Sequence, residues 1–234
     1  MMAAEDVKRA LVTGSSSGIG LAIAQALLNA GWGVIGLDVA PARLVHPAFS
    51  STEVNLCDAE ATERAVQAAG SVQALVHAAG VLRVGRLGEL SNEDSRLMWQ
   101  LHVDAVTRIA NQVVPAMAKA GGGRVVLVGS RVARGMAGRS QYAATKAALV
   151  ALARSWAAET AAAGVTVNVV SPAATETAML ADPARATVAP KLPPLGRLIQ
   201  PGEIAALVAF LLSPDAAAIT GQDIQICGGA SLAA

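Results

Sequence analysis

Aromatic residues are scarce in this chain of 234 residues, at 3% of the total, and only one of them is a tyrosine. The net charge is +1, so neither sign of charge dominates. A chain without stacking residues or a basic excess lacks the usual features of a nucleic-acid-binding surface. Any chemistry that needs a phenol falls on Tyr142.

Long apolar runs and an export signal are also missing. Hydrophobic residues make up 53% of the chain, yet no apolar run approaches the about 18 residues of a membrane span. The segment Met1–Arg9 is short and polar and has no apolar stretch typical of a leader. Cys57 and Cys227 are far apart and fit no metal-binding spacing. We therefore expect a cytoplasmic protein with reduced thiols, no membrane span and no metal site.

Short apolar segments alternate with helical segments along the whole chain. The predicted strands are Arg9–Thr13, Gly33–Asp38, Ser51–Asn55, Ala74–His77, Arg124–Gly129, Thr166–Val170 and Asp223–Ile226. The predicted helices are Gly18–Ala30, Ala59–Ala69, Asn92–Ala120, Ser140–Ala163 and Pro201–Leu212. Such alternation predicts one α/β domain over residues 1–234, a doubly wound Rossmann-type sheet of about seven parallel strands with helices on both faces.

Prolines mark two interruptions of this pattern. Ala40–Ser50 carries two of them, so the helix expected there is short or missing. Ala181–Pro194 carries four and is expected to be a loop.

The first predicted strand runs into the glycine-rich turn Thr13–Gly20, which is followed by a helix. A turn without side chains lets the backbone approach a pyrophosphate, and the helix N-terminus offers free N–H groups and a positive dipole end. The spacing is Gly-x-x-x-Gly-x-Gly. We expect this turn to bind a dinucleotide through Gly14, Ser16, Ser17, Gly18, Ile19 and Gly20.

The second predicted strand ends at Asp38. A carboxylate in this place accepts hydrogen bonds from ribose hydroxyls and repels a 2′-phosphate. The glycine-rich turn holds no lysine or arginine, and Arg43 beyond Pro41 is the only base nearby. These features favour NAD as the cofactor and leave NADP as the less favoured alternative.

Tyr142 and Lys146 lie four residues apart in a segment that is rich in alanine and leucine and predicted to be helical. Residues four apart share one face of a helix, so the phenol and the ammonium point the same way. A nearby positive charge favours tyrosinate over tyrosine, which makes Tyr142 a candidate proton-transfer group.

Further motifs follow in a fixed order: Ala78-Ala79-Gly80, Gly129-Ser130, Asn168–Pro172 and Ile219–Gln222. Together with the turn and the Tyr-x-x-x-Lys step, they make the chain resemble the classical short-chain dehydrogenase/reductase family from about Lys8 to Leu232. The resemblance implies an oxidoreductase that transfers a hydride between NAD and a secondary alcohol or ketone. It also implies a homo-dimer or homo-tetramer.

The resemblance assigns roles to individual residues. Ser130 would bond the substrate oxygen, Tyr142 would exchange a proton with that oxygen, and Lys146 would hold the nicotinamide ribose. The family's cofactor contacts would fall on a further set of positions: Asn55 and Leu56 at the adenine, Ala78, Ala79 and Gly80 in the turn, and Pro172, Thr175 and Thr177 at the nicotinamide.

Two histidines depart from the family's pattern. His102 stands where the family has a helical asparagine; it could supply the same backbone carbonyl, shuttle a proton, or simply pack in the helix. His77 stands where an asparagine normally ties strands together, and it could replace that bond. These departures keep open a nucleotide-binding homologue with weak catalysis.

The substrate is less constrained. The expected lid, Ala178–Leu198, is short. Four arginines follow predicted strand ends and could bind a carboxylate, or could be solvated or in oligomer contacts: Arg83, Arg86, Arg131 and Arg134. Several local strings resemble a family member that acts on a carboxylated cyclic diol. The remaining alternative is an NADPH-dependent reductase of 3-oxoacyl thioesters.

Overall fold

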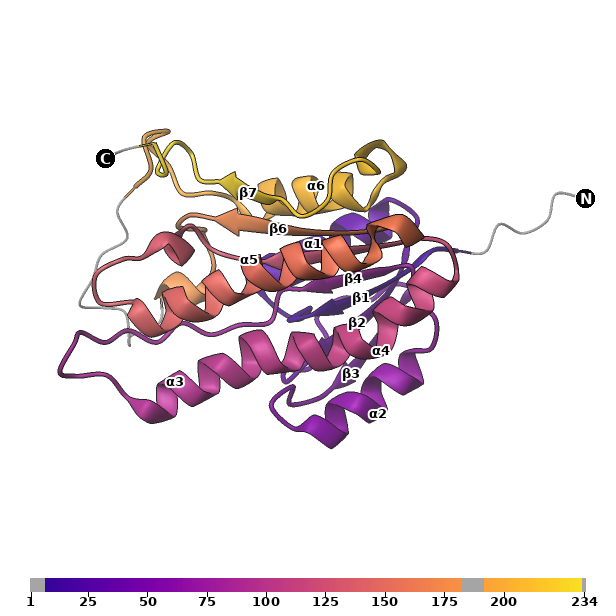
Figure 1. Ribbon diagram of the computed structural model, residues 1–234, viewed down its shortest axis with the longest axis horizontal. Helices are drawn as coiled ribbons and strands as arrows, with labels where there is room; N and C mark the ends of the chain where they lie inside the picture. The colour runs from indigo at the N-terminus through magenta and orange to yellow at the C-terminus, as the bar shows by residue number, and fades with distance from the viewer. Residues whose placement is uncertain (1–6, 182–191, 233–234) are drawn as a thin grey trace, which may run out of the picture.

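The computed structural model describes residues 7–181 and 192–232. Seven parallel strands form one sheet in the order β3-β2-β1-β4-β5-β6-β7 (Figure 1). The strands are β1 (Arg9–Thr13), β2 (Gly33–Asp38), β3 (Phe49–Glu53), β4 (Ala74–His77), β5 (Gly123–Val128), β6 (Val165–Pro172) and β7 (Asp223–Ile226). The doubly wound Rossmann-type sheet expected from the sequence is confirmed.

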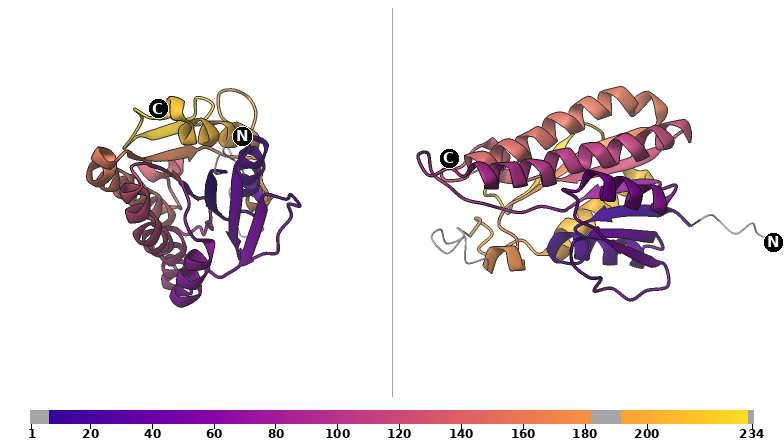
Figure 2. Two further views of the ribbon diagram at one scale, coloured as in Figure 1. Left: turned by 90° about the vertical axis from the view of Figure 1, so that its right-hand side faces the viewer. Right: turned by 90° about the horizontal axis from the view of Figure 1, so that it is seen from below.

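Helices cover both faces of the sheet (Figure 2). They are α1 (Gly18–Asn29), α2 (Ala59–Ala69), α3 (Asn92–Trp99), α4 (Ala105–Lys119), α5 (Ser140–Thr160) and α6 (Pro201–Leu212). Buried residues of α1 and α6 share one core cluster, and those of α2, α4 and α5 share another. Strand β1 contributes side chains to both clusters, because successive residues of a strand point to opposite faces: Ala10 and Val12 lie in the first cluster and Leu11 lies in the second.

The strand order reverses between β1 and β4, two neighbouring inner strands. Thr13 and His77, the last residues of these strands, are partners in the register. Ligands of open parallel sheets bind outside the carboxyl ends of the strands where the order reverses. The topology therefore predicts a ligand-binding site at the carboxyl ends of β1 and β4.

The helix predicted over Asn92–Ala120 is not continuous, which corrects that prediction. A π-helical turn, Gln100–Asp104, separates α3 from α4. Its wider turn carries no glycine or proline that the sequence would reveal, and such turns often mark functional sites. His102 lies in this turn and is fully buried.

The bounds of several other elements shift: Arg124–Gly129 is observed as Gly123–Val128, Thr166–Val170 as Val165–Pro172, and Gly18–Ala30 as Gly18–Asn29. The strand predicted at Ser51–Asn55 is observed as Phe49–Glu53, because pairing with β2 sets its register from Val34 opposite Phe49. The helix predicted to Ala163 ends in a 3-10 turn, Ala161–Ala163. Residues 40–50 contain no helix, as their prolines predicted.

Among the described residues, no helix is long and apolar enough to cross a membrane. The same part of the chain holds no group of three or more His, Cys, Asp or Glu that could bind a metal ion.

Candidate active site

The turn between β1 and α1 is closed around two glycines. A Cβ on Gly20 would lie 2.1 Å from the carbonyl oxygen of Gly14. Gly14 has a φ of 70°, and a Cβ there would lie 2.8 Å from the amide nitrogen of Ala79. Side chains are therefore excluded from both positions by neighbouring backbone, and the turn packs directly against the segment that follows β4.

Helix α1 begins without a side-chain cap. Its N-cap residue, Ser17, has extended backbone and makes no capping hydrogen bond, whereas Asp58 caps α2 and Ser91 caps α3. A helix N-terminus of this kind leaves backbone N–H groups for an anion. The turn and the uncapped helix fit the pyrophosphate of a dinucleotide.

Asp38 is held beside this turn by two backbone bonds. Its Oδ2 accepts from the amide of Ser16 at 2.9 Å, and its Oδ1 accepts from the amide of Ala40 at 2.9 Å. Ser16 also donates from its hydroxyl to the carbonyl of Ala40 at 3.0 Å. The carboxylate is thus fixed at the end of β2, next to the predicted phosphate site.

Asn55 and Leu56 lie beyond β3. The Asn55 side chain is exposed and its Oδ1 accepts from the amide of Cys57 at 3.0 Å, while Leu56 is buried. The side-chain oxygen expected to face an adenine therefore already shapes its own turn, although a carbonyl oxygen has a second lone pair to offer.

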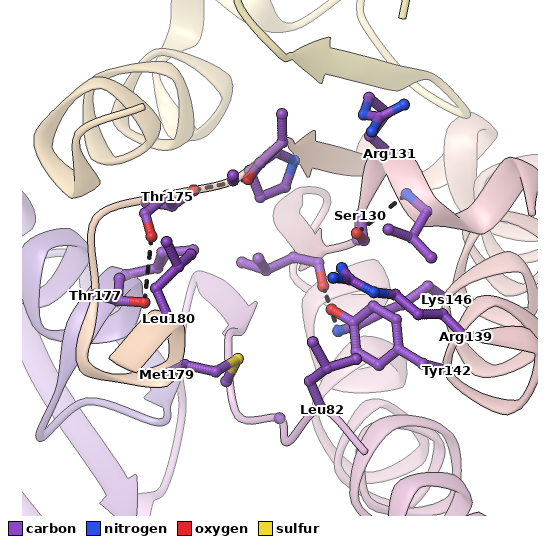
Figure 3. A pocket seen from close by; sticks show the side chains of 18 of the residues that line it. Leu82, Ser130, Arg131, Arg139, Tyr142, Lys146, Thr175, Thr177, Met179 and Leu180 are labelled. Carbon is purple, nitrogen blue, oxygen red and sulfur yellow. Dashed lines mark hydrogen bonds between the residues drawn. The ribbon is translucent and has the colours of Figure 1, made fainter. Parts of the chain in front are cut away.

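A cavity of about 220 Å³ opens next to the turn, at the carboxyl ends of β4, β5 and β6 (Figure 3). The structure brings to it most of the residues predicted for catalysis and for the nicotinamide end: Ile19, Ala78, Gly80, Ser130, Tyr142, Lys146, Pro172, Thr175 and Thr177. Ala79 and His102 are buried behind this lining. Thr175 and Thr177 lie on one side of the cavity, and Ser130 and Tyr142 lie on the other (Figure 3).

Ser130 lies two residues after the end of β5 and is 8% exposed. Its Oγ accepts a hydrogen bond from the amide of Val132 at 3.2 Å. That bond orients the side chain and leaves the hydroxyl proton to be donated elsewhere. Tyr142 lies in the first turn of α5 and points into the same cavity (Figure 3).

Lys146 lies one helical turn after Tyr142 and is 4% exposed. Its Nζ donates to the carbonyl of Val128 at 2.9 Å and lies 5.7 Å from the centroid of the Tyr142 ring. Burial lowers the pKa of Lys146 to about 8, so the ammonium form still prevails at neutral pH. A cation at this place stabilises a phenolate more than a phenol.

His102 uses both ring nitrogens to hold the site together. Its Nε2 accepts from the amide of Val81 at 3.0 Å, so the ring proton sits on Nδ1 and is donated to Oγ1 of Thr145 at 2.8 Å. Thr145 then donates to the carbonyl of Tyr142 at 2.9 Å. Burial, with the charge of Lys146, keeps the pKa of His102 well below its usual range. The geometry thus favours a positioning role over a proton shuttle.

His77 forms the bond between strands expected for it. Oγ1 of Thr13 accepts from the amides of Ala78 and Ala79, each at 3.1 Å, so its own proton goes to Nδ1 of His77 at 2.9 Å. Burial, and secondarily the charge of Lys146, lowers the pKa of His77 to about 3. A neutral imidazole therefore joins β1 to β4.

Of the four arginines predicted near the pocket, only Arg131 lines the cavity. Arg83 pairs with Asp94 at 3.4 Å, and Arg86 and Arg134 are exposed. The other cavity arginine, Arg139, was missed in the sequence. No helical spacing signals it, because Arg139 is the N-cap residue of α5 and has non-helical backbone, so its place depends on the fold of the preceding loop.

The expected lid is described only in part. Residues 178–181 form a 3-10 turn, and Met179 and Leu180 line the cavity. Residues 182–191 of that segment, and with them most of the predicted loop Ala181–Pro194, lie outside the described residues.

A family model described as Enoyl-(Acyl carrier protein) reductase matches residues 14–231. The chain belongs to the short-chain dehydrogenase/reductase family. The 3-oxoacyl-(acyl-carrier-protein) reductase FabG of Vibrio harveyi is 36% identical over 95% of this chain and 96% of its own. The 2,3-dihydro-2,3-dihydroxybenzoate dehydrogenase of Escherichia coli is 36% identical over 97% of this chain and 98% of its own.

Solved structures agree with this assignment. The aldohexose dehydrogenase of Thermoplasma acidophilum has a TM-score of 0.90 and 26% identity, over 97% of this chain and 95% of that one. An actinorhodin polyketide ketoreductase solved with NADPH has a TM-score of 0.88 and 30% identity, over 98% of this chain and 99% of that one. The protein is therefore an NAD(P)(H)-dependent oxidoreductase acting on CH–OH groups.

Proposed function

We propose that this enzyme interconverts a secondary alcohol and the matching ketone with NAD(H), and that Tyr142 transfers the proton. The observation that carries the proposal is the convergence of Ser130, Tyr142 and Lys146 on one cavity beside the uncapped N-terminus of α1. When bound, the dinucleotide accepts or supplies the hydride.

The side chains divide the remaining work among them. Ser130 donates its hydroxyl proton to the substrate oxygen, because its Oγ is already oriented by the amide of Val132. In the direction of oxidation, Tyr142 takes the proton of that oxygen while the carbon loses its hydride. Lys146 stabilises the phenolate through its charge, held in place by the carbonyl of Val128.

Replacement of the phenol tests this assignment. Tyr142→Phe should lower kcat by about 100-fold or more, because general acid–base catalysis typically contributes that much. Dinucleotide affinity, measured by fluorescence titration, should stay within about 3-fold of wild type, since the ring remains. If wild type turns over and Tyr142→Phe is equally fast, Tyr142 is not the proton-transfer group.

The choice of NAD rests on Asp38, whose carboxylate is fixed beside the turn and would repel a 2′-phosphate. NADH should bind wild type at least about 10-fold more tightly than NADPH, and Asp38→Ala should narrow this ratio. Glu63→Ala, an exposed acid on α2, is the control and should leave the ratio unchanged. Tighter binding of NADPH by wild type would exclude the NAD assignment.

A second candidate function is the NADPH-dependent reduction of 3-oxoacyl thioesters. The 36% identity with FabG favours it. Acetoacetyl-coenzyme A with NADPH is a suitable probe, and faster turnover of this pair than of any alcohol with NAD would decide for the reductase. Tight dinucleotide binding without turnover of any substrate would instead indicate a nucleotide-binding homologue with weak catalysis.

We further propose a homo-oligomer, a dimer or tetramer. Two large side chains on helices support it, since Trp99 is 44% exposed and Phe210 is 43% exposed. Light scattering at several concentrations measures the number of subunits.

A further inference from the structure

A serine interrupts a row of buried valines on β6. Val165, Val167 and Val169 belong to one core cluster on one face of the sheet, and Ser171 is the next residue of that row. Ser171 is fully buried. A buried hydroxyl costs free energy unless it forms a hydrogen bond, whereas a fourth apolar side chain would extend the core. The hydroxyl is therefore present for the hydrogen bond that it forms.

That bond joins Ser171 to a carboxylate on the neighbouring strand. Oγ of Ser171 donates to Oδ1 of Asp223 at 2.5 Å, and Oδ2 of Asp223 accepts from Nε2 of Gln225 at 2.9 Å. Asp223 and Gln225 lie two residues apart on β7 and share one face, and Gln225 is the register partner of Ser171. Hydrogen bonds to an ionised acceptor are roughly twice as strong as those between neutral groups. Asp223 therefore holds two neutral side chains from one place.

Gln225 extends these contacts to the C-terminal segment. Its Oε1 accepts from Oγ of Ser231 at 3.3 Å. The neighbouring residue, Ala230, lines the cavity, and its carbonyl accepts from Nη1 of Arg131 at 3.4 Å. A chain of hydrogen-bonded side chains thus leads from the interior of β6 to the segment that binds Arg131, the residue after Ser130.

The other end of this chain lies against the residue before Ser130. A Cβ on Gly129 would lie 2.6 Å from Oγ of Ser171, so the hydroxyl lies directly against the Gly129 backbone. The amide of Gly129 also donates to the carbonyl of Val170 at 2.8 Å. Figure 3 shows Arg131 on the same side of the cavity as Ser130. Both sequence neighbours of Ser130 are therefore held by one connected set of residues.

We propose that Asp223 is a positioning residue for Ser130: through Ser171 and Gln225 it fixes the backbone on both sides of Ser130, so that the serine hydroxyl meets the substrate oxygen. Asp223 does not line the cavity, so it acts through other side chains. A misplacement of about 1 Å can lower a rate about 100-fold, even when its cause lies away from the reacting atoms. The proposal rests on the function proposed above and adds a residue to it.

Hydrogen exchange tests the positioning in the free enzyme, without any substrate. The Val132 amide donates to Oγ of Ser130, so its exchange with deuterium reports whether that hydroxyl keeps its place. Asp223→Ala, and Ser171→Ala, which breaks the same link, should each speed the exchange of this amide at least about 10-fold. Asp223→Asn keeps one acceptor oxygen and should have a smaller effect. Mass spectrometry of overlapping peptides measures the exchange.

Thr220→Val is the matched control, because it removes a hydrogen bond to the other end of β6. Oγ1 of Thr220 accepts from the amide of Val167 at 3.0 Å, four residues before Ser171. The control should leave the exchange of the Val132 amide within about 2-fold of wild type. Unchanged exchange of this amide in both test variants, or an equal acceleration in Thr220→Val, would overturn the proposal. Equal acceleration throughout the sheet would also overturn it, because it would mean a general loss of stability.

A cycle of variants shows whether the effect on turnover passes through Ser130. The probes are cyclohexanol with NAD and acetoacetyl-coenzyme A with NADPH. Asp223→Ala should lower kcat about 10-fold, with KM for the dinucleotide within about 3-fold of wild type. In a Ser130→Ala background the same change should alter kcat by less than about 2-fold, because the group being positioned is gone. Equal losses in the two backgrounds would overturn the proposal.

The two measurements separate this proposal from the one on which it rests. If wild type turns over neither probe, the failure belongs to the proposed reaction, and the exchange of the Val132 amide alone decides the positioning. If wild type turns over a probe but Asp223→Ala changes neither the exchange nor kcat, the reaction stands and the positioning role fails.

Discussion

The two sides of the crevice obtain their shape by opposite means. The turn between β1 and α1 depends on missing side chains, because Gly20 leaves room for the backbone of Gly14 and Gly14 leaves room for the backbone of Ala79. The side built from the end of β4 and the π-helical turn depends on buried polar side chains, His77 and His102, whose hydrogen bonds join separate elements. Adding a side-chain atom to the glycines of the first side should therefore destabilise the protein. On the second side, the loss of a histidine hydrogen bond should do so.

The largest effect is expected where a methyl group would meet backbone. Gly20→Ala places a Cβ 2.1 Å from the carbonyl oxygen of Gly14. Because the clash is with backbone, the turn must move as a whole to relieve it. The free energy of unfolding should therefore fall by about 4 kcal/mol or more. Urea denaturation measures the change. Gly202→Ala, in α6 with no atom within 4 Å of the new Cβ, is the control and should be neutral or slightly stabilising. Equal stability of the two variants would refute the steric argument.

A smaller effect is expected where hydrogen bonds are lost. His102→Leu keeps an apolar side chain in the π-helical turn but removes the partners of the Val81 amide and of Thr145. Leaving buried polar groups unpaired should lower the free energy of unfolding by about 2–3 kcal/mol. His102→Asn, which can still donate and accept, should lose less. A His102→Leu variant as stable as wild type would show that these bonds contribute nothing.

The smallest effect is expected in how the free energy of unfolding changes with pH. The folded state keeps His77 neutral down to a pKa of about 3, whereas the unfolded chain protonates it near the ordinary 6.5. Between these values the unfolded state binds more protons, so stability falls as the pH falls, by up to about 1.4 kcal/mol per unit for this group. Well above pH 6.5 both states are neutral at this group, and it contributes no slope.

Urea denaturation at pH 7, 6 and 5 measures this slope. His102 adds to it in the same direction, because its pKa is also lowered. His77→Gln should reduce the change of the free energy of unfolding with pH by at most about 1.4 kcal/mol per pH unit, which is the contribution of one proton. An unchanged slope in His77→Gln would mean that His77 is not held neutral in the folded state.

Most of the fold followed from local pattern. Alternating apolar strands and helices predicted the sheet, and the bounds of Gly33–Asp38, Ala59–Ala69 and Pro201–Leu212 were predicted to the residue. The break at Gln100–Asp104 could not be predicted, because a π-helical turn is stabilised by tertiary bonds of His102 and not by a breaker in the sequence. The register of β3 likewise depends on its pairing with β2.

The site residues were predictable where a motif on a helix fixes their spacing. They were less predictable where the conformation of a loop determines which side chains reach the cavity. The Tyr-x-x-x-Lys spacing predicted that Tyr142 and Lys146 share one helix face, and both side chains line the cavity. The arginines depended on how the segment between β5 and α5 folds back on Gly85, which brings in Arg139 and leaves Arg134 exposed. The ring nitrogen that carries the proton in His77 and in His102 could be assigned only from the hydrogen-bond partners in the structure.

The place of β1 in the sheet has a consequence for the protein's synthesis. It is the earliest strand of the described chain, and it lies inside the sheet between β2 and β4. One edge of this apolar strand stays unpaired until the ribosome has released residues beyond His77. Unpaired strand edges recruit other chains, and slow non-local pairing prolongs the exposure. The nascent N-terminal third is therefore where misassembly and chaperone contact should concentrate.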